Sequence, residues 1–307
     1  NSFFASVEEL FHPEYKKMPM AVCGNPEARR GIILAKNELA KGYGVKTAET
    51  IWQARRKCPD LVLCPPRHDL YRFYCEKLNA IYEQYTSQVE RFGIDESYLD
   101  VTGSLHLFGG DPVALAHEIR RRVTRETGLT VSVGVSWCKV FAKLGSDLKK
   151  PDAVSVISRD NYKQIVWPKP VGSLLFVGRQ TEQRLIQLGI RTIGELACTS
   201  PELLRRRFGK QGDQLYCYAN GLDDSPVLEA GQQEEIQSVG HSITFSRDLC
   251  SHDDIRTSVA ALSDKVASRL RRYGFKASAV QVTIKDPSLK VISRQKPLPL
   301  PSYLAAD

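Results

Sequence analysis

The chain has 307 residues, of which 42% are hydrophobic and 25% are charged, and its formal net charge is +8. This length predicts two or three domains, and the composition is that of a soluble globular protein. No stretch approaches the roughly 20 apolar residues that cross a bilayer. No basic and then apolar leader opens the chain either, so we expect a cytoplasmic protein without a membrane partner.

Strands and helices are predicted to alternate through the first 165 residues. Short apolar runs predict strands at Met20–Cys23, Gly31–Ala35, Leu61–Leu63, Thr130–Val135 and Val154–Ile157. Asp69 and Asp111 are expected to cap two helices. Lys139–Lys149 predicts another helix, which Pro151 stops. This mixture predicts an α/β layer, of which a ferredoxin-like sheet is one form.

The composition changes at Trp167–Pro170, which predicts a domain boundary. Residues 171–221 have a helical pattern punctuated by glycines, and the acidic stretch 222–236 predicts a linker. Further elements are expected as a strand at Val239–Phe245, a helix from about Asp253 to Tyr273, and strands at Ala277–Ile284 and Lys290–Ser293.

The charges are unevenly distributed along the chain. Residues 222–254 contain eight acidic side chains and one arginine, whereas residues 266–307 contain eight basic side chains and two acidic ones. A uniformly solvated surface seldom separates charge in this way, so the basic part predicts a polyanionic partner. Nucleic acid is favoured over a membrane because no basic amphipathic helix dominates the sequence.

The eight cysteines include no C-x-x-C pair, and no histidine pair lies at zinc spacing. This pattern argues against a disulfide framework and against a zinc site. We therefore expect reduced thiols in the protein core.

Two adjacent carboxylates, Asp95 and Glu96, lie between strand-like runs in the segment Arg91–Thr102. We expect them at a tight turn or a strand edge. Neighbouring anions repel, so a divalent cation beside them would favour the ionised pair. Hard oxygen ligands suit Mg²⁺, which completes its shell with water and substrate phosphate. Taken alone, such a pair is more typical of an ordinary polar hairpin turn.

Several further segments change this interpretation. They are Asn1–Glu8, Gly93–Asp100, Val133–Lys143 with Ser146–Pro151, Val177–Thr181 with Leu188–Gly194, and Ser238–His241 with Arg247–Leu249. Together these segments resemble the signatures of Y-family translesion DNA polymerases, particularly the bacterial DNA polymerase IV-like branch. Each is weakly specific alone. They occur in the family's order over essentially the whole chain, and this coincidence is strong.

The resemblance implies an α+β multidomain fold. Its expected parts are a ferredoxin-like palm at 1–165 with fingers inserted at about 15–66, a helical thumb with a helix-hairpin-helix at 166–231, a linker at 232–236, and an α/β little finger at 237–307. Both ends of the chain interrupt elements, so we expect a fragment with a truncated little finger. The family's other metal-bridging aspartate is expected two residues before the position of Asn1.

By resemblance, Asp95 is a metal ligand and Glu96 is the adjacent catalytic carboxylate, which is also expected at the metal. Two Mg²⁺ ions at this site would activate the primer 3′ hydroxyl and neutralise the leaving pyrophosphate. Phe4 matches the steric gate beneath the incoming sugar, although a ring at this position is otherwise typical of core packing. Phe3 is placed in the same nucleotide site and is also typical of palm packing. Lys150 matches a lysine that contacts the triphosphate.

Three positions depart from the family's pattern. In the fingers, the family commonly has Asn-Tyr-Glu-Ala-Arg, and the tyrosine and arginine positions carry Glu38 and Lys41 here. Lys41 keeps a charge for the triphosphate without the bidentate fork of arginine, and Glu38 cannot donate to a phosphate. In the thumb, the first glycine of the hairpin is replaced by Phe176, which restricts the approach of the backbone to DNA.

Four residues are expected to bind DNA. Gly178, Arg179 and Thr181 begin the helix of the thumb hairpin, whose backbone N–H groups hold a phosphate. Arg247 lies in the matching little-finger segment. Arg205–Arg207 either reinforce phosphate binding or form a solvated helix face.

The resemblance thus implies a monomeric, template-directed DNA polymerase with an open, low-fidelity site and a role in DNA repair, the SOS response and mutagenesis. Its expected partners are primer–template DNA, deoxynucleoside triphosphates, and a sliding clamp bound through a C-terminal motif beyond Asp307. Two alternatives stay open: a non-catalytic DNA-binding scaffold with the same fold, and a metal-dependent nucleotidyl cyclase. A cyclase would need neither a thumb nor a basic DNA track.

Overall fold

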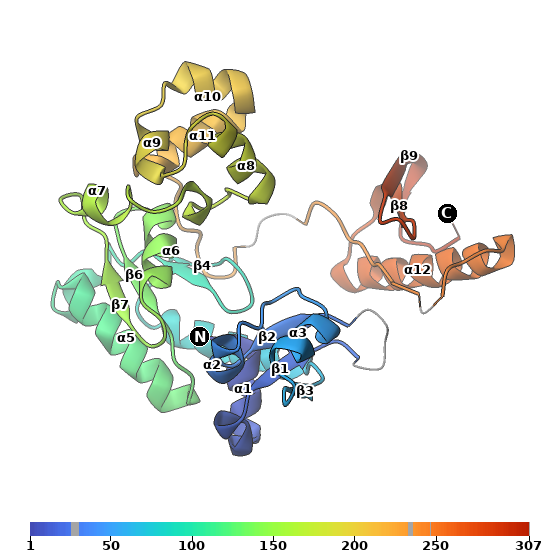
Figure 1. The fold of residues 1–307 in the computed structure, drawn as a ribbon, viewed down its shortest axis with the longest axis horizontal. Helices are drawn as coiled ribbons and strands as arrows, with labels where there is room; N and C mark the ends of the chain where they lie inside the picture. Colours follow the sequence, from blue (N-terminus) through green and yellow to red (C-terminus); the bar gives the residue numbers. More distant parts are fainter. Residues whose placement is uncertain (26–30, 233–235, 246, 307) are drawn as a thin grey trace. The chain divides into compact units, whose positions relative to one another are not determined.

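The computed structural model describes residues 1–25, 31–232, 236–245 and 247–306 (Figure 1). Its larger compact unit comprises residues 1–25 and 32–232, and the smaller unit contains the described residues from 236 to the C-terminus. Each unit mixes helices with strands, as predicted. Among the helices of these ranges, none is long and apolar enough to cross a membrane.

The segment expected to form the fingers contains a three-stranded sheet. Its central strand β1 (Met20–Cys23) is antiparallel to β2 (Ile33–Lys36) and parallel to β3 (Val62–Cys64). All four residues of β1 are buried, as a central strand requires. Helices α2 (Glu38–Gly42) and α3 (Ile51–Lys57) contribute to the core of this sheet.

The segments on either side of the expected fingers make up the region that is predicted to be the palm. They are α1 (Phe3–Phe11), η1 (Pro13–Lys17), α4 (His68–Tyr82), β4 (Val89–Arg91), β5 (Ser97–Leu99), η2 (Leu105–Phe108), α5 (Pro112–Thr127), β6 (Val133–Val135), α6 (Lys139–Leu148) and β7 (Val154–Val156). The strands form two pairs, with β4 antiparallel to β5 and β6 parallel to β7. Helices α1, α4 and α5 share one buried core.

The two predicted helix caps have different outcomes. The Asp111 carboxylate accepts a hydrogen bond from the Val113 N–H at 2.8 Å, so the cap of α5 is confirmed. Helix α4 begins at His68, and the prediction for Asp69 is wrong because this residue lies inside the first turn. There Asp69 faces Arg72 at 3.5 Å and contributes through the helix dipole instead.

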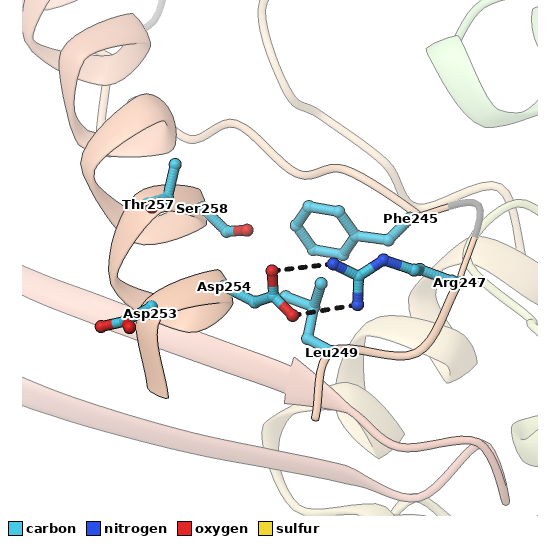
Figure 2. Close-up of a pocket in the computed structure, with 7 residues that line it drawn as sticks. All are labelled: Phe245, Arg247, Leu249, Asp253, Asp254, Thr257 and Ser258. Atoms are coloured by element: carbon cyan, nitrogen blue, oxygen red, sulfur yellow. Dashed lines mark hydrogen bonds and ion pairs between the residues drawn. The ribbon is translucent and has the colours of Figure 1, made fainter. Parts of the chain in front are cut away.

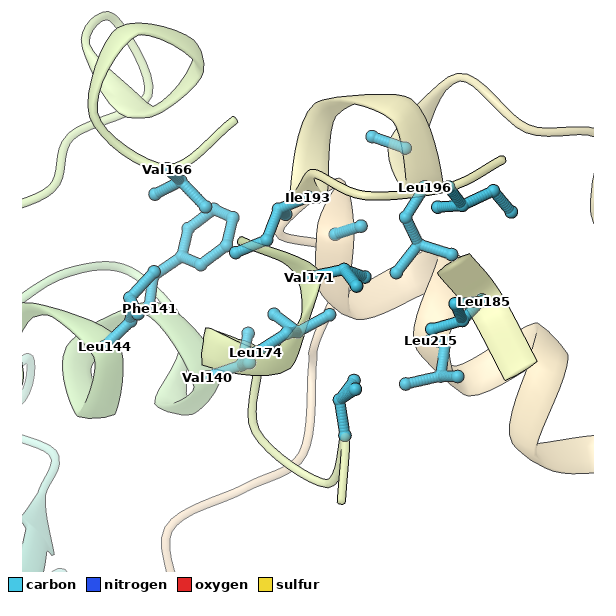
Figure 3. Close-up of a cluster of buried hydrophobic side chains, with 14 of the residues drawn as sticks. Val140, Phe141, Leu144, Val166, Val171, Leu174, Leu185, Ile193, Leu196 and Leu215 are labelled. Atoms are coloured by element: carbon cyan, nitrogen blue, oxygen red, sulfur yellow. The ribbon is translucent and has the colours of Figure 1, made fainter. Parts of the chain in front are cut away.

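Helix α7 (Tyr162–Ile165) ends directly before the segment 166–231 that is expected to form the thumb. The elements of that segment are all helical, and they are η3 (Val171–Ser173), α8 (Arg179–Gln187), α9 (Ile193–Ala197), α10 (Pro201–Phe208) and α11 (Lys210–Ala219). Figure 3 shows that its buried side chains continue into α6, where Phe141 and Leu144 belong to the same hydrophobic cluster as Leu174 and Ile193. The shared cluster anchors the thumb helices to the palm.

The first part of the acidic stretch 222–236 lies against the palm. The Ala230 N–H donates to the Ser87 carbonyl at 2.8 Å, and the Leu228 N–H donates to the Glu90 carboxylate at 2.9 Å. The Asp223 carboxylate also accepts from the Val140 N–H at 3.2 Å, in the first turn of α6. These residues are therefore fixed by hydrogen bonds, which their polar composition did not predict.

The smaller unit contains α12 (His252–Tyr273) and an antiparallel pair formed by β8 (Ala277–Lys285) and β9 (Val291–Ser302). The helix, the first strand and its pairing with a second strand were predicted, but β9 extends to Ser302, well beyond the predicted end at Ser293. The strand predicted at Val239–Phe245 is wrong, because residues 239–245 are irregular in the structure. An alternating pattern yields a strand only where a neighbouring backbone completes its hydrogen bonds, and β8 pairs with β9 instead.

The cysteines are free thiols, as expected, but not all of them lie in the core. Cys23, Cys58, Cys64, Cys75 and Cys138 are buried. Cys198 and Cys250 are exposed and Cys217 is half-buried, so the prediction of core thiols is wrong for these three. Cys198 is the residue that caps the C-terminus of the short helix α9.

Strand β6 and helix α6 approach each other closely at Gly134. A Cβ at this position would lie 1.9 Å from the carbonyl oxygen of Ala142 and 2.6 Å from the backbone nitrogen of Ser146. Both are backbone atoms of α6, so they cannot rotate away as a side chain would.

We expect Gly134→Ala to destabilise the larger unit by about 1–3 kcal/mol or more, because the helix must shift to admit the methyl group. Thermal unfolding of the purified variant measures the effect. Gly103→Ala is the matched control, since no atom lies within 4 Å of a Cβ at Gly103. Equal unfolding temperatures for the two variants would contradict the close packing of β6 on α6.

Candidate active site

The adjacent carboxylates lie in the turn that joins β4 to β5. The Glu96 carbonyl accepts from the Phe92 N–H at 2.9 Å and from the Gly93 N–H at 3.3 Å, which closes the turn directly after the last residue pair of the two strands. Asp95 is exposed and Glu96 is half-buried. The predicted tight turn is therefore present, and it presents both carboxylates on the palm.

Helix α6 supplies a lysine to this turn. The Lys143 ammonium donates to a Glu96 carboxylate oxygen at 2.8 Å and to Asp147, one helical turn later, at 3.0 Å. Burial lowers the pKa of Lys143, but the contacts with Glu96 and Asp147 raise it by more, so the pKa of Lys143 lies above its ordinary value. The Lys150 ammonium binds Asp147 in turn at 2.6 Å. Alternating charges thus run from the turn along α6 to Lys150.

Among the residues that the structure describes, Asp95 has no such cationic partner in direct contact. Loss of hydration raises its pKa, and the neighbouring Glu96 carboxylate raises it further. The ionised form of Asp95 is therefore disfavoured by its surroundings, although a carboxylate binds a cation mainly in that form. This is the behaviour expected of two anions held side by side.

The donor set of the turn suits a hard divalent cation. Asp95 and Glu96 offer only oxygen ligands, and Mg²⁺ is often held by one or two carboxylates plus substrate phosphates and water. Within the ranges that the structure describes, no group of three His, Cys, Asp or Glu side chains is placed to hold a metal ion. The described side chains alone thus offer a partial shell, which fits an ion that arrives with a phosphate substrate.

The ring of Phe4 lies at the start of α1 and stacks on Tyr71 of α4. The ring centroids are 4.1 Å apart and the ring planes differ by 14°. Phe4 is half-buried, so part of its ring stays uncovered, whereas Phe3 is only 6% exposed and lies in the palm core. Phe4 can thus contact a ligand while Phe3 serves mainly for packing.

The first residues of the chain lie beside the start of α2 and the loop that follows α6. The Ser2 hydroxyl donates to the Glu38 carboxylate at 3.3 Å, and the Asp152 N–H donates to the side-chain oxygen of Asn1 at 3.0 Å. Pro151, next to Lys150, lines the same cavity as Ser2 and Glu38. The structure thus brings one fingers position and the loop after Lys150 to the helix that carries Phe4.

The fingers positions that depart from the family pattern contact each other. The Lys41 ammonium lies 3.4 Å from the Glu38 carboxylate, and the Ser2 hydroxyl donates to Glu38 at 3.3 Å. Asn37 is buried and caps α2 by accepting from the Ala40 N–H at 3.0 Å. A cavity of about 250 Å³ opens beside Ser2 and Glu38. Lys41 therefore remains on an exposed helix face with its charge partly balanced.

The thumb hairpin keeps its bend despite the missing glycine. Phe176 adopts a φ of +65°, the left-handed conformation that glycine adopts most easily, and its side chain is 52% exposed. Gly178 then begins α8, whose first hydrogen bond runs from the Glu182 N–H to the Gly178 carbonyl. The N–H groups of the first turn, including those of Arg179 and Thr181, are thus available to an anion.

The arginines expected near DNA differ in their pairing. Arg247 forms a two-pronged ion pair with Asp254 at 2.8 and 2.9 Å, beside a pocket of about 330 Å³ (Figure 2). In the thumb, Arg205 binds Asp213 at 2.9 Å. Arg206 and Arg207 of the same run are exposed. Arg247 therefore has an internal anion where we predicted a DNA phosphate.

Comparison with known proteins identifies the family. Residues 1–147 match the impB/mucB/samB family, residues 236–307 match the C-terminal domain of that family, and residues 174–223 match the thumb domain of DNA polymerase-iota. Over 307 residues the chain is 48% identical to a DNA polymerase IV of Acetivibrio thermocellus, covering 100% of this chain and 77% of the relative. The chain belongs to the Y family of DNA polymerases. The resemblance inferred from the sequence is thus confirmed.

Other relatives and solved structures agree with this assignment. The DNA polymerase IV 2 of Bacillus subtilis is 38% identical over 288 residues, which are 92% of this chain and 69% of the relative. A Y-family DNA polymerase chimera of Dbh and Dpo4 has a TM-score of 0.87 at 23% identity, over 98% of this chain and 86% of that one. DinB from Sulfolobus solfataricus has a TM-score of 0.68 with the same coverage and identity. The predicted α+β multidomain fold is confirmed.

Sequence reasoning missed two residues beside the predicted gate. Tyr71 is fully buried under Phe4, and Glu8 is fully buried one turn after Phe4 on α1. An acidic residue on the apolar face formed by Phe4 and Val7 was a signal, because a buried glutamate needs a partner.

Asp95→Asn should raise the unfolding temperature at pH 7 in metal-free buffer, because the raised pKa means that folding disfavours the ionised carboxylate. Below about pH 3.9, the ordinary pKa of aspartate, the carboxyl is protonated in the native and unfolded states and the gain should vanish. Thermal unfolding at the two pH values measures this. Asp60→Asn, at an exposed position, should have little effect. A loss of stability for Asp95→Asn at pH 7 would show that its charge is not destabilising.

Proposed function

We propose that the chain is a template-directed DNA polymerase of the translesion type, which adds deoxynucleotides to a primer 3′ end. The observation that carries the proposal is the Asp95–Glu96 pair, presented at a palm turn in a chain 48% identical to a named DNA polymerase IV. Family membership supports DNA synthesis over the scaffold and the cyclase. The helical thumb further supports a DNA substrate.

Asp95 and Glu96 are the proposed ligands for divalent metal, with two Mg²⁺ ions as the proposed number. When bound, such ions lower the pKa of the primer hydroxyl and neutralise the leaving pyrophosphate. Lys143 orients the Glu96 carboxylate through the 2.8 Å contact. Asp95 has no such contact with a described lysine or arginine, so a bound cation would be its direct partner.

Lys150 and Lys41 are the proposed contacts for the triphosphate of the incoming nucleotide. Each lysine is paired with one carboxylate, Asp147 and Glu38 respectively. A triphosphate carries more negative charge than a single carboxylate, so it competes well for an ammonium group, which binds as a point charge. Lys150 is the stronger candidate because its neighbour Pro151 lines the cavity beside Ser2 and Glu38, at the start of α1.

Phe4 is the proposed steric gate, and Phe3 supports it from the palm core. One face of the Phe4 ring lies against Tyr71, so the ring cannot retreat in that direction when a sugar approaches its uncovered part. A 2′ hydroxyl on the sugar would then collide with the ring. Selection against ribonucleotides would follow from rigid contact rather than from recognition of the base.

DNA is proposed to bind along the thumb and the little finger. In the thumb, the first turn of α8 with Gly178, Arg179 and Thr181 offers backbone N–H groups to a phosphate. In the little finger, Arg247 would exchange Asp254 for a phosphate. Binding of a sliding clamp, action as a monomer, a cytoplasmic location and a role in the SOS response and mutagenesis complete the proposal by analogy with the family.

In the full-length protein, Asp95→Asn should reduce primer extension by at least about 10²–10³-fold, the loss typical of one well-placed electrostatic group. Primer–template affinity should change little, because DNA is held by the thumb and the little finger. Single-turnover extension and fluorescence anisotropy measure the two quantities. Asp60→Asn serves as the control for both. Near-normal extension by Asp95→Asn would refute its role at the metal site.

Phe4→Ala should increase the use of ribonucleotides relative to deoxynucleotides by at least about 10-fold. This is the lower end of the change in discrimination that a small change in pocket shape causes. The kcat/KM values for one ribonucleotide and its deoxynucleotide measure the ratio. Phe73→Ala removes a 60% exposed ring from α4 and should leave the ratio unchanged. If Phe4→Ala lowers both activities equally and also lowers Tm by several degrees, Phe4 is a packing residue.

A further inference from the structure

Glu8 is an acidic residue among the buried, otherwise apolar side chains of α1. It lies on α1, four residues after Phe4, and its side chain is 0% exposed. Glutamate is almost never fully buried unless it is paired. Its hydrogen-bond partners Arg67 and Tyr71 come from the start of α4 and not from the Asp95–Glu96 turn, so the proposed metal site does not explain its presence.

Both carboxylate oxygens of Glu8 have partners in the segment that begins α4. The Tyr71 hydroxyl donates to Oε1 at 2.6 Å, and Arg67 Nε donates to the same oxygen at 3.1 Å. The other guanidinium nitrogen, Nη2, donates to Oε2. Arg67 is partly exposed, whereas Tyr71 is fully buried. A charged network of three side chains thus joins α1 to α4 in the palm.

The same three side chains also contact Phe4, the proposed gate, through Tyr71. The ring of Tyr71 stacks on Phe4 at 4.1 Å, while the hydroxyl of Tyr71 is bound to Glu8 on the helix that carries Phe4. His68 meets the rings of both Phe4 and Tyr71 edge-on, with centroids 6.0 Å away. Phe4 therefore cannot move relative to Tyr71 without loss of stacking, and Tyr71 cannot turn without loss of a hydrogen bond to a carboxylate.

Stability alone does not account for this arrangement. A buried ion pair is often no more stabilising than well-packed apolar side chains of the same volume. Stacking alone would hold the Tyr71 ring loosely, since stacked aromatic pairs tolerate a range of offsets. The hydrogen bond to Glu8 is directional and fixes the far end of the ring. Burial and Glu8 raise the pKa of Tyr71, so its hydroxyl stays a donor at neutral pH.

We propose that Glu8, held by Arg67, is a positioning residue that fixes the Tyr71 ring and through it the Phe4 ring, and so sets how strictly the site excludes a 2′ hydroxyl. The inference rests on the gate role of Phe4 in the proposed function. Glu8 acts only through Tyr71 and needs no contact with the nucleotide.

The test uses Tyr71→Phe and Glu8→Gln in the full-length polymerase. Tyr71→Phe keeps the stacked ring and removes only the hydroxyl that Glu8 accepts from. We expect each variant to reduce discrimination against ribonucleotides by about 3- to 10-fold, because the ring gains freedom when a buried hydrogen bond to a charged group is lost. The measurement is the ratio of kcat/KM for a deoxynucleotide to that for its ribonucleotide. Partial unfolding lowers both values together and leaves this ratio unchanged.

Tyr74→Phe is the matched control, since Tyr74 lies one turn further along α4 and packs against the same core without contacting Phe4 or Glu8. Its ratio should equal that of the parent. In a Phe4→Ala background, Tyr71→Phe and Glu8→Gln should cause no further change, because the ring that they position is gone.

Each outcome decides between the parts of the proposal. An unchanged ratio in folded Tyr71→Phe and Glu8→Gln, while Phe4→Ala changes it, overturns the role of Glu8 and leaves the gate intact. An equal effect of these variants with and without Phe4 shows that they act elsewhere and also overturns it. If Phe4→Ala itself leaves the ratio unchanged, the gate assignment fails first. Should Glu8→Gln not fold, Tyr71→Phe carries the test alone.

Discussion

The larger unit depends on the close contact between strand β6 and helix α6, which Gly134 permits because it has no side chain. Helix α6 serves three regions from this fixed position. Phe141 enters the hydrophobic cluster shared with the thumb, Lys143 holds the Glu96 carboxylate, and Lys150 follows the helix end, where it binds Asp147 of the same helix. Because a packed helix is stiff, a small displacement at β6 would move all three groups together. The geometry of the site and the attachment of the thumb therefore both depend on the packing of α6 against β6.

The site uses charge in two different ways. Glu96 is neutralised by a lysine, and the alternating series that begins there continues along α6, so these charges stabilise one another. Asp95 is left beside an anion with its pKa raised, which means that the fold tolerates an unfavourable charge at this position. A loss of folding stability of this kind is common at functional sites, including those that bind cations. Glu8 shows a third arrangement, a buried charge that is fully paired and fixes the direction of a neighbouring ring.

Much of the fold and part of the site could be predicted from the sequence, where local signals and tertiary packing agree. The buried strand Met20–Cys23, the cap at Asp111 and the turn at Asp95 are examples. Val239–Phe245 was predicted wrongly because alternation says nothing about whether a partner strand exists. Tyr71 was missed because its role comes from contacts with α1, more than 60 residues away in sequence. The hydrogen bonds of Leu228 and Ala230 to the palm were hidden by an acidic composition that also suits a linker.

The cations predicted to meet anionic ligands are mostly occupied by carboxylates of the protein itself. Arg247 is bound to Asp254, Lys150 to Asp147, and Lys41 to Glu38. Ordinarily, a basic side chain that binds a nucleic acid phosphate releases condensed salt ions, and this release makes the affinity fall steeply with salt. A side chain that already has a carboxylate partner exchanges one anion for another inside the protein. Counterion release then contributes less to the free energy of phosphate binding, and the displaced carboxylate is left close to the bound phosphate. The strength of such a contact then depends on where Asp254 or Asp147 can turn, a property of the protein rather than of the buffer.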